Sequence, residues 1–290
     1  MDQELENLLK CGFLFIDKPR GPSSHEVSAY IRKLLQIKKA GHAGTLDPNV
    51  SGVLIIGLNK ATRLLRFIAK DKKTYVGVMR IKKPISDINK VQEIFDKFVG
   101  EIKQIPPKES AVAKKLRTRR VYKLKVEEIE DKKILFSAEV EAGTYIRTLC
   151  QDIGKYFQKG KLIELRRTKV GQIDENKCVN LYELTDAWKI CQQKGICEPI
   201  KRLINPCDKI ILLPKVLVGK ETAETVCRGL PLAKAGVTDV EVSFKKNEFV
   251  FIINKDTKKI IAIGLAMHSS NEIQKLPDNE KLILPKIVLC

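Results

Sequence analysis

GHAGTLDPNVSGVLIIGL, residues 41–58, decides the fold more than any other stretch of this chain. Glycines and one proline surround a single acid, Asp47, and a continuous apolar run follows from Val53 to Leu58. Glycine and proline interrupt regular structure, whereas a short apolar run without breaks is typical of a buried strand. The stretch therefore predicts an irregular loop that carries Asp47, followed directly by a strand in the core.

The sequence before this loop predicts a strand, a turn and a helix. GFLFID (12–17) has the composition of a strand, and KPRGP (18–22) ends it because two prolines and a glycine disrupt regular structure. Ser23 and Glu26 have the spacing of a capping box, in which each side chain binds the other residue's backbone N–H. The helix is expected to follow, since apolar residues recur at helical spacing at Val27, Tyr30, Ile31, Leu34 and Leu35.

Strands and helices also mix downstream, without regular alternation of strand and helix. Such a mixture predicts an α+β fold with a largely antiparallel sheet. Gly143 and Thr144 are expected to cap the last of these helices. The expected strands cover 75–81, 121–129 and 134–141, and the expected helices run from Ile88 to Phe98 and from Ile146 to Phe157.

Short strands dominate beyond residue 208, with one helix expected from Thr222 to Arg228. This change predicts a large domain over 1–207 and a small β-rich domain over 208–290. The strands expected in the second domain are KIILLPKVLV (209–218), VEVSFKK (240–246), EFVFIIN (248–254) and KIIAIGLAM (259–267).

The charge is strongly basic, with 54 Lys and Arg against 35 Asp and Glu, a net charge of +19 and a pI of about 9.5. Such a field attracts a polyanion, either nucleic acid or an acidic membrane surface. A lysine-rich solvated surface without a specific partner is the alternative. The apolar runs are too short to span a bilayer, so no membrane insertion is expected.

Eight cysteines occur, and none of them forms a C-x-x-C pair. Paired zinc knuckles are therefore not expected, and buried reduced thiols are the better interpretation. The first residues, MDQELENLLKCGFLF, open acidic and do not resemble a secretion signal. We expect a reducing cytoplasmic or nuclear compartment.

Asp47 by itself indicates little, because Asp-Pro is a common start of a turn. The surrounding segments change this interpretation. In order and spacing they resemble the conserved segments of the TruB and dyskerin family of pseudouridine synthases, over roughly residues 12–173. The segments are IDKPRGPSSHEV (16–27), GHAGTLDPNVSGVL (41–54), KTYVGVMRI (73–81), AGTYIRTLCQDIG (142–154) and LRRTKVG (165–171).

The resemblance implies that Asp47 is the catalytic aspartate, which acts while the C1′–N1 bond of a uridine breaks and the base rejoins the ribose through C5. Arg147 matches the arginine that pairs with this aspartate, and a neighbouring cation favours an ionised carboxylate. Tyr75 matches the family's stacking tyrosine, although a strand tyrosine is often ordinary core packing. An everted base needs such a partner. No metal, nucleotide or redox cofactor is implied.

Further residues are expected to contact the RNA. His42 matches a position beside the displaced base, Leu165 matches the apolar residue that closes the pocket, and Lys18 lies in a loop that supports it. A basic run in AKKLRTRRVYKLK (113–125) and another in LRRTK are placed to neutralise phosphates, although such runs are often only solvated. Their expected contacts are Lys114, Arg117, Arg119, Arg120, Arg166 and Arg167.

The chain goes straight from PPKESAVAKK (106–115) into LRTRRVY, and it lacks the insertion of the stand-alone bacterial enzymes. It is therefore more similar to the archaeal and eukaryotic branch that uses an H/ACA guide RNA. This implies a substrate in ribosomal or transfer RNA, two small accessory proteins, a kink-turn-binding protein and a C-terminal PUA domain. The setting would be archaeal cytoplasm, or the nucleolus in a eukaryote. A stand-alone enzyme acting on the thymine-arm uridine of tRNA and a noncatalytic RNA-binding scaffold are the alternatives.

Overall fold

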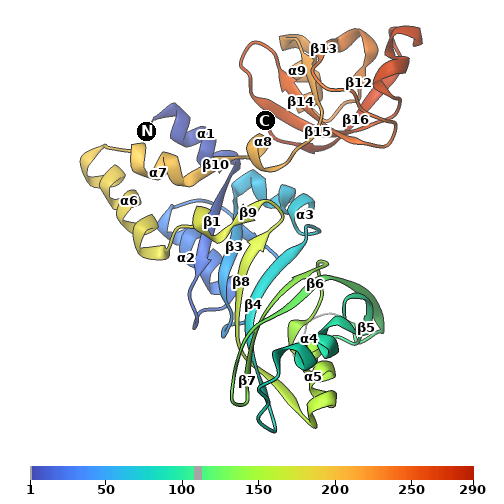
Figure 1. The fold of residues 1–290 in the computed structure, drawn as a ribbon. Helices are drawn as coiled ribbons and strands as arrows, with labels where there is room; N and C mark the ends of the chain where they lie inside the picture. The colour runs from blue at the N-terminus through green and yellow to red at the C-terminus, as the bar shows by residue number, and fades with distance from the viewer. Residues whose placement is uncertain (1, 108–112) are drawn as a thin grey trace. The chain divides into compact units, whose positions relative to one another are not determined.

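The structure is a computed structural model that describes residues 2–107 and 113–290. It divides into two compact units, residues 1–205 and 206–290 (Figure 1). Composition placed the boundary between residues 207 and 208. Residues 108–112 of the PPKESAVAKK segment lie outside the described part of the chain. Each unit has a hydrophobic core of its own and is described by itself.

Helices of the first unit cover both ends of one long sheet. They are α1 (Gln3–Cys11), α2 (Ser24–Leu34), α3 (Leu65–Ile68), α4 (Ile88–Asp96), α5 (Ile146–Gly154), α6 (Leu181–Lys194) and α7 (Glu198–Leu203), with 3-10 turns η1 (Asn59–Leu64), η2 (Lys155–Phe157) and η3 (Glu175–Lys177). The strands are β1 (Gly12–Lys18), β2 (Ala40–Ala43), β3 (Ser51–Leu58), β4 (Lys73–Ile81), β5 (Gly100–Gln104), β6 (Arg117–Glu130), β7 (Lys133–Val140), β8 (Gly160–Val170), β9 (Ile173–Asp174) and β10 (Ile204–Pro206).

The sheet has the order β10-β1-β3-β8-β4-β7-β6-β5, with β2 paired to β3 and β9 paired to β8. Its centre is antiparallel, except that β3 and β8 run parallel where Ser51 and Gly52 meet Arg166 and Arg167. This confirms the α+β fold with a largely antiparallel sheet. The parallel junction brings the loop before β3 against β8, two segments more than 100 residues apart in the sequence.

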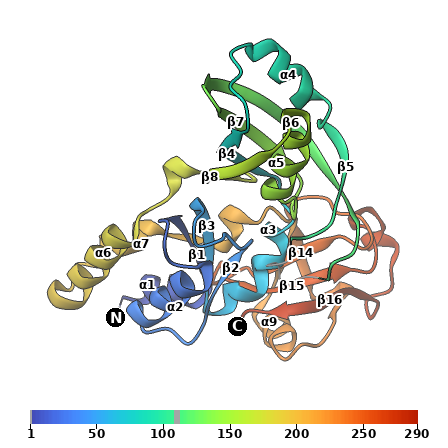
Figure 2. The same cartoon turned by 90° about the horizontal axis from the view of Figure 1, so that it is seen from below.

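Two clusters of apolar side chains hold this sheet between helices. Helices α1, α2, α6 and α7 pack on β1 and β3, whereas α4 and α5 pack on β4, β6 and β7 (Figures 1 and 2). The helix α2 begins as expected, since Ser23 and Glu26 form the capping box. The expected cap at Gly143 and Thr144 is wrong, because the N-cap of α5 is Tyr145, which makes no side-chain cap hydrogen bond.

The second unit is a six-stranded sheet in the order β12-β16-β15-β14-β11-β13, in which only β11 and β14 run parallel among the described pairs. Apolar residues of α9 contribute to its core. Its elements are α8 (Cys207–Ile210), β11 (Lys215–Val218), α9 (Lys220–Cys227), β12 (Leu232–Ala233), η4 (Lys234–Gly236), β13 (Val237–Val240), β14 (Phe249–Asn254), β15 (Ile260–Ala266), η5 (Ser270–Lys275) and β16 (Lys281–Val288).

Two strands expected here are wrong in part. The first residues of KIILLPKVLV form α8, and the strand starts only after Pro214, which has no N–H for a sheet ladder. In VEVSFKK the strand ends at Val240, and Phe244 reaches the core from irregular backbone. Burial of one aromatic ring produced an apolar pattern that resembled a strand.

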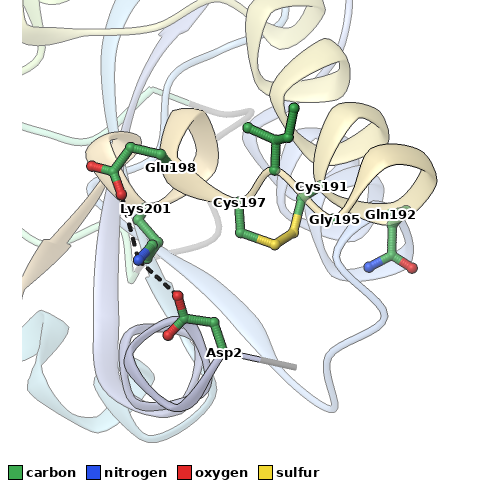
Figure 3. A pocket seen from close by; sticks show the side chains of 8 residues that line it. Asp2, Cys191, Gln192, Gly195, Cys197, Glu198 and Lys201 are labelled. Carbon is green, nitrogen blue, oxygen red and sulfur yellow. Dashed lines mark ion pairs between the residues drawn. A yellow bond between two sulfur atoms is a disulfide. The ribbon is translucent and has the colours of Figure 1, made fainter.

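Four of the eight cysteines form disulfides, Cys191–Cys197 between α6 and α7 and Cys227–Cys290 in the second unit. The expectation of reduced thiols is therefore wrong for these four. Next to the first disulfide, Lys201 Nζ lies 2.7 Å from the carboxylate of Asp2 (Figure 3). It lies equally close to the carboxylate of Glu4, and the two acids raise the pKa of the amine. Lys201 thus ties the start of α1 to α7.

Across residues 2–107 and 113–290, none of the helices combines the length and the apolar composition needed to cross a bilayer.

Candidate active site

The loop between β2 and β3 holds Asp47 in an exposed position above a buried ammonium group. Lys18, at the end of β1, is fully buried, and its Nζ donates to the carbonyls of Pro19 and Val50 at 2.8 Å and of Pro48 at 3.4 Å. The N–H of Gly21 also donates to Pro48 O at 2.9 Å. Lys18 therefore fixes the backbone on the C-terminal side of Asp47.

Arg167 fixes the two ends of the same loop from β8. Its side chain is almost fully buried, and its Nε and Nη2 donate to the carbonyls of Val53 at 2.8 Å and Gly44 at 2.9 Å. A Cβ at Gly52, which has a φ of +101°, would lie 2.1 Å from the backbone oxygen of Arg167. Only glycine permits this close approach of β3 to β8.

The start of α2 holds the loop from a third direction. Ser24 Oγ accepts from Leu46 N at 2.8 Å and donates to Leu46 O at 2.9 Å. The backbone N–H and C=O of Leu46, the residue before Asp47, therefore both have a hydrogen-bond partner. His42, on β2, contacts Ser28 Oγ through Nδ1 at 3.1 Å and Thr45 Oγ1 through Nε2 at 3.3 Å. Burial, followed by the charges of His25 and Arg167, lowers the pKa of His42, which favours a neutral ring.

Asp47 forms an ion pair with Arg147, the second residue of α5. Their side chains are 57% and 41% exposed, so the pair stands where a large ligand can reach it. This places together the two residues that the sequence predicted to pair, although they are 100 positions apart.

The backbone that carries Arg147 is held by Gln104, a residue that the sequence analysis missed. Gln104 ends β5 and is buried, and its Nε2 donates to Tyr145 O at 3.2 Å while its Oε1 accepts from Tyr145 N at 3.0 Å. Tyr145 is the N-cap of α5 and has no capping side chain of its own. Gln104 therefore fixes the start of the helix on which Arg147 lies.

Tyr75 and Leu165 lie on adjacent strands and on one face of the sheet. Tyr75 on β4 is the partner of Arg167 on β8, and Leu165 is the partner of Gly77. Side chains two residues apart on a strand share a face, so both accompany Arg167, which binds the Asp47 loop. A Cβ at Gly77 would lie 2.8 Å from Phe136 and 3.1 Å from Leu165, so the glycine leaves room for these two side chains.

The first basic run divides between two faces of β6. Arg117 is the partner of Gln104, so alternation puts Arg117 and Arg119 on the face where α5 begins, whereas Arg120 faces the other way. Arg119 Nε and Thr144 Oγ1 are buried and have no hydrogen-bond partner among the described residues. Lys114 is exposed, and its Nζ donates to Pro107 O at 2.6 Å.

Three cations that were expected to contact RNA have partners within the chain. Lys18 and Arg167 are buried beneath the Asp47 loop, as described above. Arg166 points to the opposite face from Arg167, where it binds Asp17 through two hydrogen bonds of 2.9 and 3.0 Å and Glu175 at 2.6 Å. The donors of these three side chains thus bind carbonyls or carboxylates of the chain, and their contact with RNA stays a prediction.

Lys73 adds a further buried cation below the loop. Its Nζ donates to Ala69 O and Asp71 O, both at 2.6 Å, and its Cε approaches the face of Gly44. Burial, followed by the charge of Arg167, lowers the pKa of Lys73 to about 8. Its position at the start of a strand was visible in KTYVGV, but its partners were not.

The site has one carboxylate, Asp47, on an exposed loop, and the guanidinium of Arg147 reaches it from α5. Hydrolysis of a glycosidic bond ordinarily needs two carboxyl groups, and no second acid occurs in the loop from Gly41 to Gly52. Within the described ranges, the His, Cys, Asp and Glu residues form no group of three or more that could hold a metal ion.

Family models match nearly the whole chain. Residues 32–146 match the N-terminal domain of TruB family pseudouridylate synthases, and residues 147–212 match the C-terminal domain of tRNA pseudouridylate synthase B. Residues 214–281 match the PUA domain, and residues 1–28 match the DKCLD domain.

Relatives from archaea are similar over most of their length. The chain is 38% identical over 276 residues to the "Probable tRNA pseudouridine synthase B" of Archaeoglobus fulgidus, which covers 94% of this chain and 84% of the relative. It is 39% identical over 291 residues to the protein of the same name from Pyrococcus furiosus, which covers 97% and 85%. The chain therefore belongs to the TruB family of pseudouridine synthases, which are isomerases.

Two solved structures show which members of the family this chain is similar to. A chain in "Crystal Structure of a Cbf5-Nop10-Gar1 Complex" is 37% identical with a TM-score of 0.84, and the match covers 99% of this chain and 87% of that one. A chain in "Structure of H/ACA RNP bound to a substrate RNA containing 2'-deoxyuridine" is 36% identical with a TM-score of 0.83 and the same coverage. Within the family, the chain is thus Cbf5-like.

Proposed function

We propose that Asp47 is the carboxylate with which this pseudouridine synthase isomerises uridine in RNA. The observation that supports this most is the ion pair with Arg147, because it orients one exposed carboxylate on a loop whose carbonyls are fixed by Lys18 and Arg167. In the reaction the C1′–N1 bond breaks, the base turns, and a C1′–C5 bond forms. The proton lost from C5 is balanced by one gained at N1, so no co-reactant is consumed.

The remaining site residues receive supporting roles in this proposal. Tyr75 stacks on the everted uracil, and Leu165 closes the apolar side of the pocket. The neutral ring of His42 contacts the displaced nucleotide and does not act as an acid or a base. Arg117 and Arg119, which lie on the α5 face of β6, contact phosphates near the site, and Lys114 and Arg120 extend the contact along the RNA. Residues 1–207 form the catalytic domain, and residues 208–290 act as an RNA-binding PUA domain.

We further propose that the chain is the catalytic subunit of an H/ACA ribonucleoprotein. Support comes from its likeness to chains solved with Nop10 and Gar1 and with a substrate RNA, and from the match of residues 1–28 to the DKCLD domain. The partners would be a guide RNA, proteins of the Nop10 and Gar1 type and a kink-turn-binding protein. The substrate would be ribosomal RNA, and the compartment would be the cytoplasm of an archaeal cell.

The relatives from Archaeoglobus fulgidus and Pyrococcus furiosus are named as probable tRNA pseudouridine synthases, which favours tRNA as a second substrate class. The two readings separate when the purified chain is given unmodified tRNA alone, and then guide RNA, accessory proteins and a matching substrate. We expect site-specific pseudouridine that follows the guide sequence when the guide is altered. Equal turnover of tRNA without any added component would contradict the guide-dependent proposal, and the Asp47→Ala variant is the negative control in both arms.

A further inference from the structure

A basic hollow lies in the first unit, and none of the residues assigned above line it. It has a volume of about 720 Å³ and is formed by the end of α1, the loop after α2, the turn η1 and α6. Five cations line it, and Glu6 is the one carboxylate among its described lining residues. The cations are Lys10, Lys38, Lys39, Lys60 and Arg63.

The walls of this hollow are held together by Asn59. Its Nδ2 donates to Leu9 O at 3.0 Å, and its Oδ1 accepts from Lys39 N at 3.1 Å. Its own N–H donates to Lys39 O at 2.8 Å, so one residue joins α1, the loop after α2 and η1. Asn59 has a φ of +42°, a conformation that asparagine tolerates better than most side chains. The cations are therefore carried on a connected backbone frame.

Like charges crowd inside the hollow. Partial burial, followed by the charges of Lys10 and Arg63, lowers the pKa of Lys60. A group of cations facing a recess, with a single acid, raises the local concentration of anions. The chain as a whole carries +19, and its family acts on RNA, so a phosphate-rich strand is the anion that the chemistry favours.

We propose that this hollow is an RNA-backbone site, which binds phosphates of the RNA away from the uridine that is isomerised. This inference rests on RNA being the substrate class and not on guide dependence. Phosphate contacts of this kind position a nucleic acid without reading its sequence. The site would thus hold one end of the bound RNA while the Asp47 loop engages the target.

The fluorescence of Trp188 can report binding at this hollow. It is the single tryptophan of the chain, and it lines the hollow from α6. Tryptophan emission of the full-length protein therefore reports on this place and on no other. A blunt-ended RNA duplex is the probe, because it has a high phosphate density and no unpaired uridine that the Asp47 site could take.

The test compares two triple variants of equal charge change. Lys10→Gln, Lys39→Gln and Lys60→Gln empty the hollow of three cations, whereas Lys82→Gln, Lys83→Gln and Lys132→Gln remove three exposed lysines elsewhere in the same unit. We expect the first triple to weaken duplex binding about tenfold at moderate salt and to reduce the slope of log K against log salt by about 2 to 3. The second triple should change affinity less than about twofold.

Trp188 emission should change with duplex in the wild type and in the second triple, in step with binding measured by anisotropy, and should lose this change in the first. The proposal would be overturned if the two triple variants weakened duplex binding equally. It would also be overturned if Trp188 emission stayed constant while the protein became saturated with duplex. Inorganic pyrophosphate is the last arm. A full Trp188 response at a lower phosphate concentration than the duplex needs would indicate a small phosphorylated ligand and contradict the RNA assignment. None of these outcomes depends on turnover.

Discussion

Three buried cations support the Asp47 loop, each through hydrogen bonds to backbone carbonyls. Lys18, Lys73 and Arg167 are each less than 5% exposed, and each donates to backbone carbonyls at or near the Asp47 loop. A carbonyl oxygen stabilises a cation without neutralising it, so the three charges repel one another in a poorly solvated region. The loop is therefore rigid at some cost in stability.

Lys73 makes that cost measurable as a dependence of stability on pH. Its pKa is about 8 in the folded chain, against 10.5 for an exposed lysine. Between these two values the unfolded chain binds more protons than the folded one, so the free energy of unfolding rises with pH. Relative to Lys73→Met, the wild type should gain roughly 2 kcal/mol between pH 7 and pH 9.5.

Chemical denaturation of both proteins across this range checks the prediction. The difference between them removes the titration of other groups, such as the thiols. A difference that stays flat from pH 7 to pH 9.5 would show that Lys73 titrates normally in the folded chain.

Gln104 is expected to act on turnover through Arg147. In Gln104→Leu both hydrogen bonds to Tyr145 are lost, and the start of α5 is free to shift. A displacement of about 1 Å in a catalytic group costs roughly a hundredfold in rate. We expect kcat to fall about 10- to 100-fold, while KM for RNA stays within about threefold because no RNA contact is removed.

Gln92 provides a matched control for this prediction. Its side chain makes the same kind of double contact, with Leu124 O at 3.0 Å and Val126 N at 2.8 Å, but it joins α4 to β6. Gln92→Leu should lower the melting temperature by a similar amount and leave kcat within about threefold. If the two variants reduce kcat equally, Gln104 acts only through general stability.

At the scale of elements, the two disulfides close loops of very different length. Cys227–Cys290 spans 63 positions and Cys191–Cys197 spans 6. A longer loop loses more entropy in the unfolded chain when it is closed, which gives about 4 kcal/mol for the first disulfide and about 2 kcal/mol for the second. Cys227→Ala should therefore destabilise its unit more than Cys191→Ala destabilises the other.

Calorimetry under oxidising conditions, with each variant compared with wild type, measures both effects. The Cys150→Ala variant is not a suitable control because this thiol is fully buried in a core. Cys11→Ser, at a half-buried cysteine outside both disulfides, is the better one. Equal destabilisation by Cys227→Ala and Cys191→Ala would contradict the loop-length argument.

Elements could be predicted where the sequence has a local signal. The capping box of α2 and the apolar run of β3 are both properties of a few adjacent residues. Strand β8 was missed because its apolar residues do not alternate strictly with polar ones. Helix α6 has a local signal that was overlooked, since Leu184, Ala187, Trp188 and Cys191 recur at helical spacing behind a capping box. KIILL was misread because apolar content alone does not separate a short helix from a strand.

At the scale of the whole molecule, the site joins segments that no local pattern connects. Asp47 and Arg147 were found because family resemblance named them. The contacts of Gln104 with Tyr145, 41 positions away, and of Arg167 with Gly44, 123 positions away, depend on the register of the sheet. That register is fixed by long-range pairing, so neither contact could be read from the sequence.

The basic charge is likewise resolved only in three dimensions. Adjacent residues Arg166 and Arg167 point to opposite faces of β8, and each has partners within the chain. The sequence predicted that the +19 charge would be used for RNA, but it could not say which cations support the fold and which remain available. Their separation requires the hydrogen bonds of each side chain.

The central claim is that the Asp47 carboxylate performs the isomerisation while other parts of the chain bind the RNA. RNA that carries tritium at C5 of uridine tests it, because the new C1′–C5 bond releases that label. Under conditions where the wild type turns over, Asp47→Asn should release tritium more than about a thousandfold more slowly. Its RNA affinity should stay within about threefold of wild type. Release by Asp47→Asn at a rate near that of the wild type would contradict the account.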